Sequence, residues 1–406
     1  MEWKHYKMDE LIEEISMGPF GSDVKKEFYV DNGVPILNGS NLQGFKLQED
    51  SFGYLTKEKA DSLKKCNAHR GDIIVTHRGT LGQIVYVPVN SKYDRYVISQ
   101  SQFRFRCKAD LVDVQYLVYY FHTREGQYKI LANASQVGVP ALARATSTFR
   151  LIDIKLPPLA TQRRIASILS SLDRKIELNN KINADLEEMA QAIFKNWFVD
   201  FEPFKDGKFV DSELGMIPEG WKVGSPYEYV KVVYGAPYKS AKFNDNGEGL
   251  PLIRIRDLKD CNPQFYTPEI LPQTEYVNMG DIVAGMDAEF VPHIWKGNTG
   301  LLNQRVCKLM PQQTSISNLF VLYLMKPELE FVQSYKTGTT VSHLGKADID
   351  KFVVVLPPLK VVEECSKILD SILQRIKNIS AESRNLSTLR DTLLPRLMSG
   401  ELEVPE

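Results

Sequence analysis

Residues 156–198 read LPPLATQRRIASILSSLDRKIELNNKINADLEEMAQAIFKNWF, a stretch that opens with two prolines and then continues for about forty residues without glycine or proline. Its apolar residues recur at alternating steps of three and four, the heptad pattern of a coiled-coil seam. We predict a long helix whose seam residues are Ile165, Leu169, Leu172, Ile176, Asn179, Asn183, Leu186 and Ile193. Asn179 and Asn183 would be polar seam residues that fix the register of the helix against its partner. The alternative is that both asparagines are solvated on a slightly rotated helix.

The same pattern returns two hundred residues later. Residues 356–359 again read LPPL, and a second run without glycine or proline follows and ends near Pro395. In the same register, this run predicts a second seam, formed by Leu369, Ile372, Ile376, Ile379, Leu386 and Leu393. Two long helices with matched apolar seams are expected to pack on each other.

The duplication extends to the segments that precede the helices. Trp3 matches Trp221 at an offset of 218 residues, Gly33-Val34-Pro35-Ile36 matches residues 249–252 at 216, and Gly71-Asp72 matches Gly280-Asp281 at 209. Tyr119 matches Tyr323 at 204, and the helices match at 200. Chance similarities would not keep this order with a steadily shrinking offset, whereas loop insertions in the first copy would. The chain is therefore a duplicated domain rather than a solenoid of short repeats.

These observations predict an α+β fold with an internal pseudo-two-fold repeat. Two similar α/β domains are separated by two long antiparallel helices that form a coiled coil. The helices are expected to be antiparallel because the second domain starts where the first helix ends, and domain termini usually lie close together. The predicted boundaries are a first domain at 1–155, a first helix at 156–202, a second domain at 203–355 and a second helix with a tail at 356–406.

Composition excludes several classes of protein. The chain has 406 residues and a formal net charge of −1, and no apolar run approaches the length that spans a membrane. The beginning of the chain lacks the apolar core of a signal peptide. Its five cysteines are scattered, with no CxxC pair and no histidine at ligand spacing, which indicates a reducing cytoplasm and no structural metal site. We therefore expect a cytoplasmic protein.

Motifs for catalysis are also missing from the sequence. The chain has no phosphate-binding GxxxxGK[ST] loop, no HExxH and no GxSxG, and neither Pro-Pro pair belongs to a methyltransferase-like (N/D)PP(Y/F) motif. Asp348, Asp350 and Lys351 could be imagined as a nuclease centre, but such residues are common at the start of a strand. We predict no catalytic residue and no metal site in this chain.

Polar residues in the first domain alternate along one predicted strand. Residues 96–107 read YVISQSQFRFRC, so a period of two places Gln100, Gln102, Arg104 and Arg106 on one face, with apolar and small residues on the other. Glutamine and arginine can form bidentate contacts with adenine and guanine edges. A sheet with one solvated face would give the same pattern, and both interpretations stay open. Earlier in this domain, residues 9–15 predict a short amphipathic helix.

The second domain carries a different set of polar residues. Arg254 and Arg256 lie two apart on a predicted strand at 252–260, with Lys259 in the adjoining turn. Asp287, in the segment that corresponds to residues 71–106 of the first domain, could accept a hydrogen bond from cytosine. It could equally pair with a neighbouring arginine and orient it. The two halves thus share framework residues and differ where loops present polar groups.

The layout resembles the specificity subunit of type I restriction–modification systems. The resemblance rests on residues 156–179 with a partial copy at 356–377, on MIPEGWKV at 216–223, on GDIIVTHRGTLG at 71–82, and on GMDAEF with LLNQRVCKL between 285 and 309. It covers essentially the whole chain. It implies a non-catalytic subunit whose two target-recognition domains each bind one half of a bipartite asymmetric site in double-stranded DNA.

The resemblance also implies partners. Two modification (methyltransferase) subunits that carry S-adenosylmethionine would dock on the helices, and two restriction (motor-nuclease) subunits that use ATP with Mg would complete the complex. No cofactor is expected on this chain. A helix of about 38 residues spans roughly 57 Å, so domains at its ends could reach successive turns of DNA, which are ~34–36 Å apart.

We predict that DNA is contacted in the first domain by exposed residues of loops and of the polar strand face, namely Ser22, Asn41, His77, Arg78, Thr80, Gln100, Gln102, Arg104 and Arg144. In the second domain the predicted contacts are Arg254, Arg256, Lys259, Asp287, His293, Trp295, Lys296, Gln304, Lys336, Thr339 and His343. The competing functions are a stand-alone DNA methyltransferase or nuclease, which would transfer methyl groups or cut DNA without partners, and a coiled-coil scaffold without a role on DNA.

Overall fold

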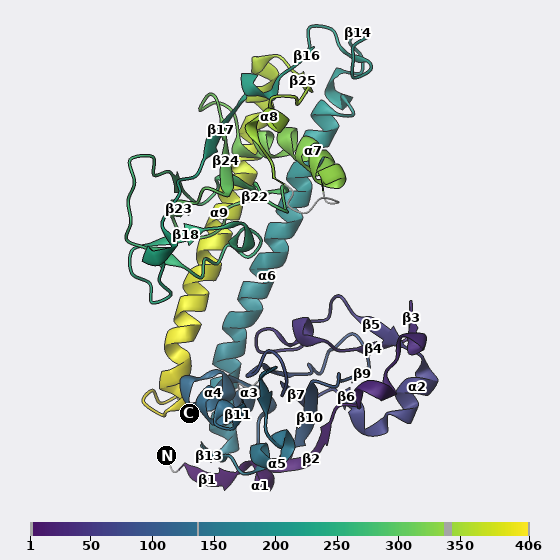
Figure 1. Cartoon of the computed structure of the whole chain (residues 1–406), viewed down its shortest axis with the longest axis vertical. Helices are drawn as coiled ribbons and strands as arrows, with labels where there is room; N and C mark the ends of the chain where they lie inside the picture. The colour runs from purple at the N-terminus through teal and green to yellow at the C-terminus, as the bar shows by residue number, and fades with distance from the viewer. Residues whose placement is uncertain (1–2, 136–137, 337–342, 405–406) are drawn as a thin grey trace. The chain divides into compact units, whose positions relative to one another are not determined.

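The computed structural model describes residues 3–135, 138–336 and 343–404 (Figure 1). The chain divides into two compact units: Met1–Lys175 with Leu386–Glu406 forms unit 1, and Ile176–Asn385 forms unit 2. Each unit contains one globular domain and parts of both long helices, α6 (Leu159–Phe198) and α9 (Leu359–Met398).

Both long helices begin directly after their Pro-Pro pair, three residues later than the predicted boundary, and α6 ends at Phe198 rather than at 202. Pro395, where the second run without glycine or proline ends, does not end the helix, because α9 continues to Met398. A proline interrupts the hydrogen-bond ladder of a helix. Here the side chains of Leu394, Leu397 and Met398 are buried in the core of unit 1, and this packing holds the last turn.

Unit 1 contains two main sheets. The central sheet is antiparallel throughout and has the order β2-β10-β7-β8, and the second sheet has the order β3-β5-β4-β9-β6, in which only the β4–β9 pairing is parallel. A separate pair joins β1 to β13. The strands are β1 (Lys4–Lys7), β2 (Ile12–Met17), β3 (Tyr29–Val30), β4 (Val34–Ile36), β5 (Gly53–Leu55), β6 (Asn67–His69), β7 (Ile73–Thr76), β8 (Ile84–Tyr86), β9 (Arg95–Val97), β10 (Gln102–Cys107), β11 (Ala134–Ser135), β12 (Ala141–Leu142) and β13 (Asp153–Leu156). The helices are α1 (Met8–Leu11), α2 (Lys57–Ser62), α3 (Val114–His122), α4 (Arg124–Leu131) and α5 (Ala145–Arg150).

Unit 2 repeats this plan. Its central antiparallel sheet has the order β17-β24-β21-β22, its second sheet has the order β19-β18-β23-β20 with a parallel β18–β23 pairing, and β16 pairs with β25. The strands are β14 (Phe209–Val210), β15 (Ile217–Pro218), β16 (Lys222–Gly224), β17 (Val230–Tyr234), β18 (Leu250–Ile253), β19 (Tyr266–Thr267), β20 (Tyr276–Val277), β21 (Ile282–Gly285), β22 (Pro292–Ile294), β23 (Gly300–Leu302), β24 (Val306–Pro311) and β25 (Val354–Leu356). The helices are α7 (Asn318–Lys336) and α8 (Lys346–Ile349).

The two central sheets correspond strand by strand, with β2, β10, β7 and β8 matching β17, β24, β21 and β22 in the same neighbour order. The predicted fold class, two similar α/β domains with long helices in an internal repeat, is therefore confirmed. The predicted helix at 9–15 is wrong beyond its first turn: α1 ends at Leu11 and residues 12–17 form β2. Its pairing with β10 supplies backbone hydrogen bonds that outweigh the local helical pattern.

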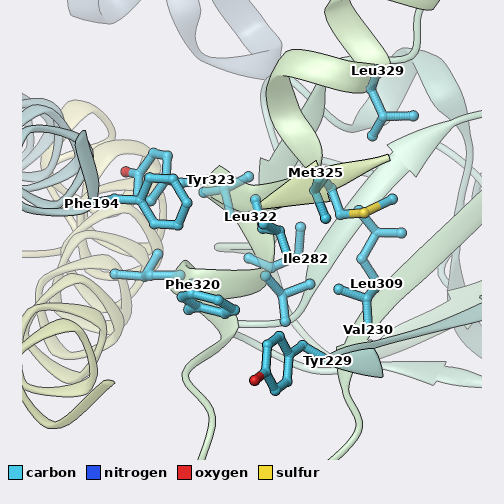
Figure 2. Packing of buried hydrophobic residues seen from close by; sticks show 14 of the residues in the cluster. Phe194, Tyr229, Val230, Ile282, Leu309, Phe320, Leu322, Tyr323, Met325 and Leu329 are labelled. Atoms are coloured by element: carbon cyan, nitrogen blue, oxygen red, sulfur yellow. The ribbon is translucent and has the colours of Figure 1, made fainter. Parts of the chain in front are cut away.

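The core of unit 2 lies between its central sheet, α7 and the long helices. Figure 2 shows Ile282 and Leu309 of the sheet beside Phe320 and Leu322 of α7, with Phe194 of α6 on the opposite side of the cluster from Leu309. The same cluster includes Leu369, Ile372 and Ile376 of α9. The globular domain is thus fused to both helices by one continuous apolar core.

Within each unit the long helices run antiparallel. In unit 1, Ile165 and Leu169 of α6 share a core with Leu397 and Leu394 of α9. In unit 2, Asn179 bonds to Glu382 and Asn183 to Ser380. In both cases a later position on α6 meets an earlier position on α9. All the predicted seam residues are buried or half-buried, namely Ile165, Leu169, Leu172, Ile176, Asn179, Asn183, Leu186, Ile193, Leu369, Ile372, Ile376, Ile379, Leu386 and Leu393.

Candidate nucleic-acid interface

Loops that are distant in sequence gather at one end of the central sheet of unit 1. The Gly18 amide donates to Gln102 O at 2.8 Å, and the His77 amide donates to Ser101 O at 2.8 Å. The Leu142 amide donates to His77 O, also at 2.8 Å. These bonds join residues 18–23, 77–82, 99–101 and 140–144 into one continuous surface, which we call the first loop edge.

Unit 2 repeats these backbone connections. The Gly235 amide donates to Val306 O at 3.2 Å, the Met286 amide to Arg305 O at 2.9 Å, and the Leu344 amide to Met286 O at 2.7 Å. Residues 235–240, 286–289, 303–305 and 343–344 therefore form an equivalent surface, the second loop edge. The duplicated domain thus presents the same set of loops twice.

Glycine is required where each edge begins. A Cβ at Gly18 would lie 1.9 Å from Ser99 O, and a Cβ at Gly235 would lie 2.1 Å from Asn303 O. No other residue tolerates so close an approach of two backbones. These two glycines lock the loop that follows β2 or β17 against the turn that precedes β10 or β24.

Five of the residues predicted in the first domain are exposed on the first loop edge: Ser22, Arg78, Thr80, Gln100 and Arg144. Arg144 adopts a left-handed backbone conformation with φ 47°, at the N-terminus of α5. His77 is half-buried, its Nε2 lies 3.1 Å from Gln100 O, and burial lowers its pKa. The neutral ring with its proton on Nε2 would therefore tie residue 77 to the turn that carries Gln100.

The predicted exposed strand face of Gln102 and Arg104 is wrong. Residues 96–107 form two strands joined by a turn, and Gln102 and Arg104 are only 1% and 3% exposed. The Gln102 side chain accepts from the Ser99 amide and donates to Asn38 O. Both faces of the central sheet are covered, so an alternating polar pattern here marks an internal network.

Arg104 neutralises a buried acid. Its guanidinium contacts Asp72, which is fully buried, at 3.3 Å and Glu14 at 2.6 Å. Unit 2 has the same arrangement, in which Lys308 lies 3.7 Å from Asp281. A buried carboxylate needs a cation beside it. This repeated ion pair explains the charge at position 104 without any ligand.

Asn41 is also an internal residue, against the prediction of DNA contact. It is fully buried, its Oδ1 accepts from the Asn38 amide at 2.9 Å, and its Nδ2 donates to Asp50 O at 2.7 Å. In unit 2 the side chain of Asp257 accepts from the Arg254 amide in the same way, at 3.0 Å. Asn41 and Asp257 therefore cap equivalent short turns.

The predicted residues of the second loop edge form a compact charged cluster. Asp287 Oδ1 lies 2.7 Å from His343 Nδ1, and its Oδ2 lies 3.3 Å from Arg305 Nε. Gln304 is exposed beside them. Lys336 donates to His343 O at 2.8 Å and to Asp348 at 2.6 Å, whereas Thr339 lies outside the described residues. Of the two interpretations of Asp287, the geometry favours the orientation of a neighbouring arginine.

Other predicted residues of the second domain are placed differently. The expectation that Arg254 and Arg256 share a strand face is wrong, because β18 ends at Ile253 and residues 255–257 form a 3-10 turn. The Arg254 guanidinium lies 4.3 Å from the centroid of the Phe265 ring, and its Nε lies 3.2 Å from Asp257 Oδ2. These contacts hold the side chain against the domain. Arg256 and Lys259 are exposed.

The predicted contacts at 293–296 lie against the body of unit 2. Trp295 is fully buried and its Nε1 donates to Asn298 O, so it cannot reach a partner. Lys296 forms an ion pair with Glu187 of α6. His293 is half-buried, and burial lowers its pKa. His293 and Lys296 line a cavity of about 360 Å³ beside α6 rather than the second loop edge.

Equivalent positions of the two edges carry different side chains. Arg78 follows β7 and forms an isolated β-bridge with Ala141. Asp287 follows β21 and forms the equivalent bridge with His343. At the shared offset of 204, Gln100 corresponds to Gln304 and Ser101 to Arg305. The side chain of Arg305 is half-exposed, and Arg305 was not among the residues predicted from the sequence. The match between Gln100 and Gln304 could have identified it, because Arg305 follows Gln304 directly.

Among the described residues no group of three or more His, Cys, Asp and Glu side chains is arranged to hold a metal ion. In the same part of the chain, no helix is both long and apolar enough to cross a membrane.

Comparison with known proteins agrees with this architecture. A family model described as the type I restriction modification DNA specificity domain matches residues 1–188 and 218–386. The chain is 27% identical over 436 residues to the MjaIX specificity subunit of Methanocaldococcus jannaschii, an alignment that covers 100% of this chain and 94% of that protein. It is 22% identical over 472 residues to the HindI specificity subunit of Haemophilus influenzae, covering 99% of this chain and 100% of that protein.

A solved structure shares the fold. The crystal structure of the type I restriction-modification S subunit from M. genitalium superposes with a TM-score of 0.53 at 16% identity, and the match covers 98% of this chain and 96% of that one. The family model spans both domains and most of α6 and α9. The chain therefore belongs to the family of type I restriction–modification DNA specificity subunits, whose function is the recognition of the DNA target.

Proposed function

We propose that the first and second loop edges each bind one half of a bipartite, asymmetric DNA site. The observation that carries this proposal is the repetition of one backbone arrangement with different side chains, above all Arg78 in one copy and Asp287 in the other. Identical edges would suit a symmetric site, whereas edges with different polar side chains suit two different half-sites.

Within each edge, exposed side chains would divide between bases and phosphates. Gln100, Arg78, Gln304 and Arg305 have the donors and acceptors that recognise base edges. Ser22, Thr80 and Arg144 on the first edge, and the exposed Arg256 and Lys259 of the second domain, would hold the phosphate backbone. Asp287 would orient Arg305, as its 3.3 Å contact supports.

We propose two identical modification subunits as partners, because the helices carry a duplicated apolar surface. Ile168 and Ile368 are exposed and occupy equivalent positions at the offset of 200, and so do Met189 and Leu389. Each unit thus presents one exposed isoleucine from one helix and one exposed methionine or leucine from the other. A surface that occurs twice would bind two copies of one protein.

The chemistry would lie on the partners. The modification subunits would bring S-adenosylmethionine, and two restriction subunits would bring ATP with Mg, while this chain contributes no catalytic residue. All five cysteines are free thiols, which supports a reducing cytoplasm as the location of the complex.

A domain exchange tests the proposal. Residues 12–150 are replaced by the corresponding segment of another family member, and methylated adenines are mapped in cells that carry the chimera with its partners. One half of the methylated sequence should change and the other should remain. A matched exchange of residues 230–349 should change the opposite half. If either exchange altered both halves, the edges would not act independently.

A further inference from the structure

Phe20 is an exposed aromatic residue on the first loop edge. Its side chain is 82% exposed, between Pro19 and Gly21 in the loop that follows β2. Large exposed apolar side chains on a polar surface commonly mark a binding site.

The loop holds Phe20 in a defined position. Its amide donates to Asp23 Oδ2 at 3.0 Å, and its carbonyl accepts from the Asp23 amide at 2.9 Å. Two residues earlier, the Gly18 amide is bonded to Gln102 O. The backbone before the ring is therefore fixed by the sheet and the backbone after it by the turn to Asp23, so the exposed ring loses little entropy on binding.

The second domain shows that the scaffold can bury an aromatic residue of this loop. Gly18 and Gly235 are equivalent at an offset of 217 residues, and Tyr238 lies three residues after Gly235 as Phe20 lies two after Gly18. Tyr238 is 5% exposed, packs in an apolar cluster and donates from its hydroxyl to Thr274 at 3.0 Å. Exposure of the ring in the first domain is thus a property of that domain and not of the shared fold.

The surroundings of Phe20 match the surface of a nucleic acid. A Cβ at Gly21 would lie 2.5 Å from Gln100 Oε1, so the glutamine amide contacts the backbone next to the ring. Ser22, Lys25 and Lys26 follow and are exposed. A flat apolar ring, an amide and cations within a few residues offer stacking for a base, donors and acceptors for its edge, and charge for phosphates.

We propose that Phe20 inserts into the DNA stack at the first half-site and acts as an aromatic wedge that helps to select the sequence there. The inference rests on the proposed DNA-binding role of the first loop edge. Side chains that enter a base step unstack and kink the duplex at a cost that depends on the step. Because Tyr238, the aromatic residue of the corresponding loop, is buried, the second half-site would receive no wedge from that loop.

The experiment uses the chain assembled with its modification subunits and duplexes that contain the mapped site. 2-Aminopurine is placed in turn at each position of both half-sites except the methylated adenines, so that extrusion of the target base does not contribute. The wild-type complex should raise the fluorescence severalfold at one step of the first half-site. Phe20→Ala should remove this signal and weaken binding by about tenfold, while Phe20→Trp should retain both.

Val89 provides the matched control. It is also 82% exposed in the same domain, but it lies beyond the end of β8 that is remote from the first loop edge. Val89→Ala should leave the affinity and the fluorescence profile unchanged. An equal effect of Val89→Ala and Phe20→Ala would mean that neither acts at the DNA.

The outcomes separate the wedge from the function on which it rests. Unchanged fluorescence and affinity in Phe20→Ala, with site discrimination intact, would overturn the wedge and leave the DNA-binding role standing. Loss of co-purification with the modification subunits would instead identify Phe20 as a protein contact. A wild-type complex that did not distinguish its site from other DNA would overturn the proposed function itself.

Discussion

Asn183 of α6 donates from Nδ2 to Ser380 Oγ of α9 at 3.0 Å, and both side chains are buried. One turn away, Asn179 Nδ2 donates to Glu382 Oε2 at 2.8 Å. The apolar seam residues would tolerate a shift of one helix along the other, whereas these two bonds require one alignment. Buried polar pairs in coiled coils cost stability and specify register.

The double variant Asn183→Leu/Ser380→Ala removes both partners of the buried hydrogen bond. We expect its free energy of unfolding to lie within about 1 kcal/mol of the wild type or above it, because no buried polar group is left unpaired. The helices should, however, lose their single alignment, so the spacing between methylated half-sites should become less strict. Urea unfolding and mapping of methylated sites measure the two effects.

Asn183→Leu alone serves as the comparison, since it leaves the Ser380 hydroxyl buried without this partner. It should be less stable than the double variant. A double variant that lost several kcal/mol, or that kept a strict spacing, would contradict the role in register.

Arg104→Met tests whether the charge at position 104 serves the fold. We expect a loss of about 3 kcal/mol in the free energy of unfolding, because the variant leaves the buried carboxylate of Asp72 with Arg106 as its remaining close cation. The exposed Gln100→Ala is the control and should stay within about 0.5 kcal/mol of the wild type. Chemical unfolding of the purified chain measures both. If the Arg104→Met protein were as stable as the wild type and its site discrimination were altered, Arg104 would contact DNA rather than stabilise the fold.

His122 should make unit 1 sensitive to acid. The ring packs on Phe45, Nε2 lies 2.9 Å from Ile84 O, and burial lowers the pKa of His122, with the charge of Arg390 acting in the same direction. The unfolded chain binds a proton below about pH 6.5, and the folded chain does so only at lower pH. Stability should therefore fall as the pH drops below about 6.5, at up to about 1.4 kcal/mol per pH unit from this group.

His122→Gln keeps a donor for Ile84 O but cannot titrate. Unfolding by urea at pH 7.5, 6.5 and 5.5 should show a smaller loss of stability in this variant than in the wild type. An identical pH dependence in the two proteins would mean that His122 is not responsible.

The sequence predicted the parts of the fold that depend on long periodicity. The heptad pattern of the seam residues extends over tens of residues. The offsets that relate Trp3 to Trp221 and Tyr119 to Tyr323 extend over hundreds, so local sequence context does not obscure either signal. Residues 9–15 show the opposite case: a short apolar pattern fits a helix or a strand, and the β2–β10 pairing decided the outcome.

Burial was the main feature that the pattern of single strands could not provide. Alternation assigned Gln102 and Arg104 to one face of β10, but it could not show that Phe103 and Phe105 lie in one core while the opposite face of the sheet, with Ile74 and Val85, lies in another. Because the sheet that contains β10 is covered on both faces, the polar side chains of β10 are buried. Comparison of the two copies was more informative, since Asp72–Arg104 and Asp281–Lys308 recur as pairs.

The last prediction concerns Gln100 and Gln304, which occupy equivalent exposed positions at the start of the turns that lead into β10 and β24. Each turn is fixed by two backbone hydrogen bonds, from Gly18 and His77 in one copy and from Gly235 and Met286 in the other. A glutamine amide on a rigid turn can donate to and accept from an adenine edge. We expect Gln100→Ala to relax one base pair of the first half-site, and Gln304→Ala one base pair of the second, each at a cost of ~1–3 kcal/mol in discrimination.

The assembled methyltransferase is assayed with duplexes in which every position of the site is changed singly. Lys259→Ala is the control, because an exposed lysine that contacts phosphate should weaken binding to all duplexes alike and reduce the dependence of affinity on salt by about one ion. If Gln100→Ala and Gln304→Ala reduced base discrimination in the same half-site, the two loop edges would not recognise the two half-sites independently. If both variants behaved like Lys259→Ala, with discrimination intact, the glutamines would hold the backbone, and sequence recognition would fall to Arg78 and Arg305.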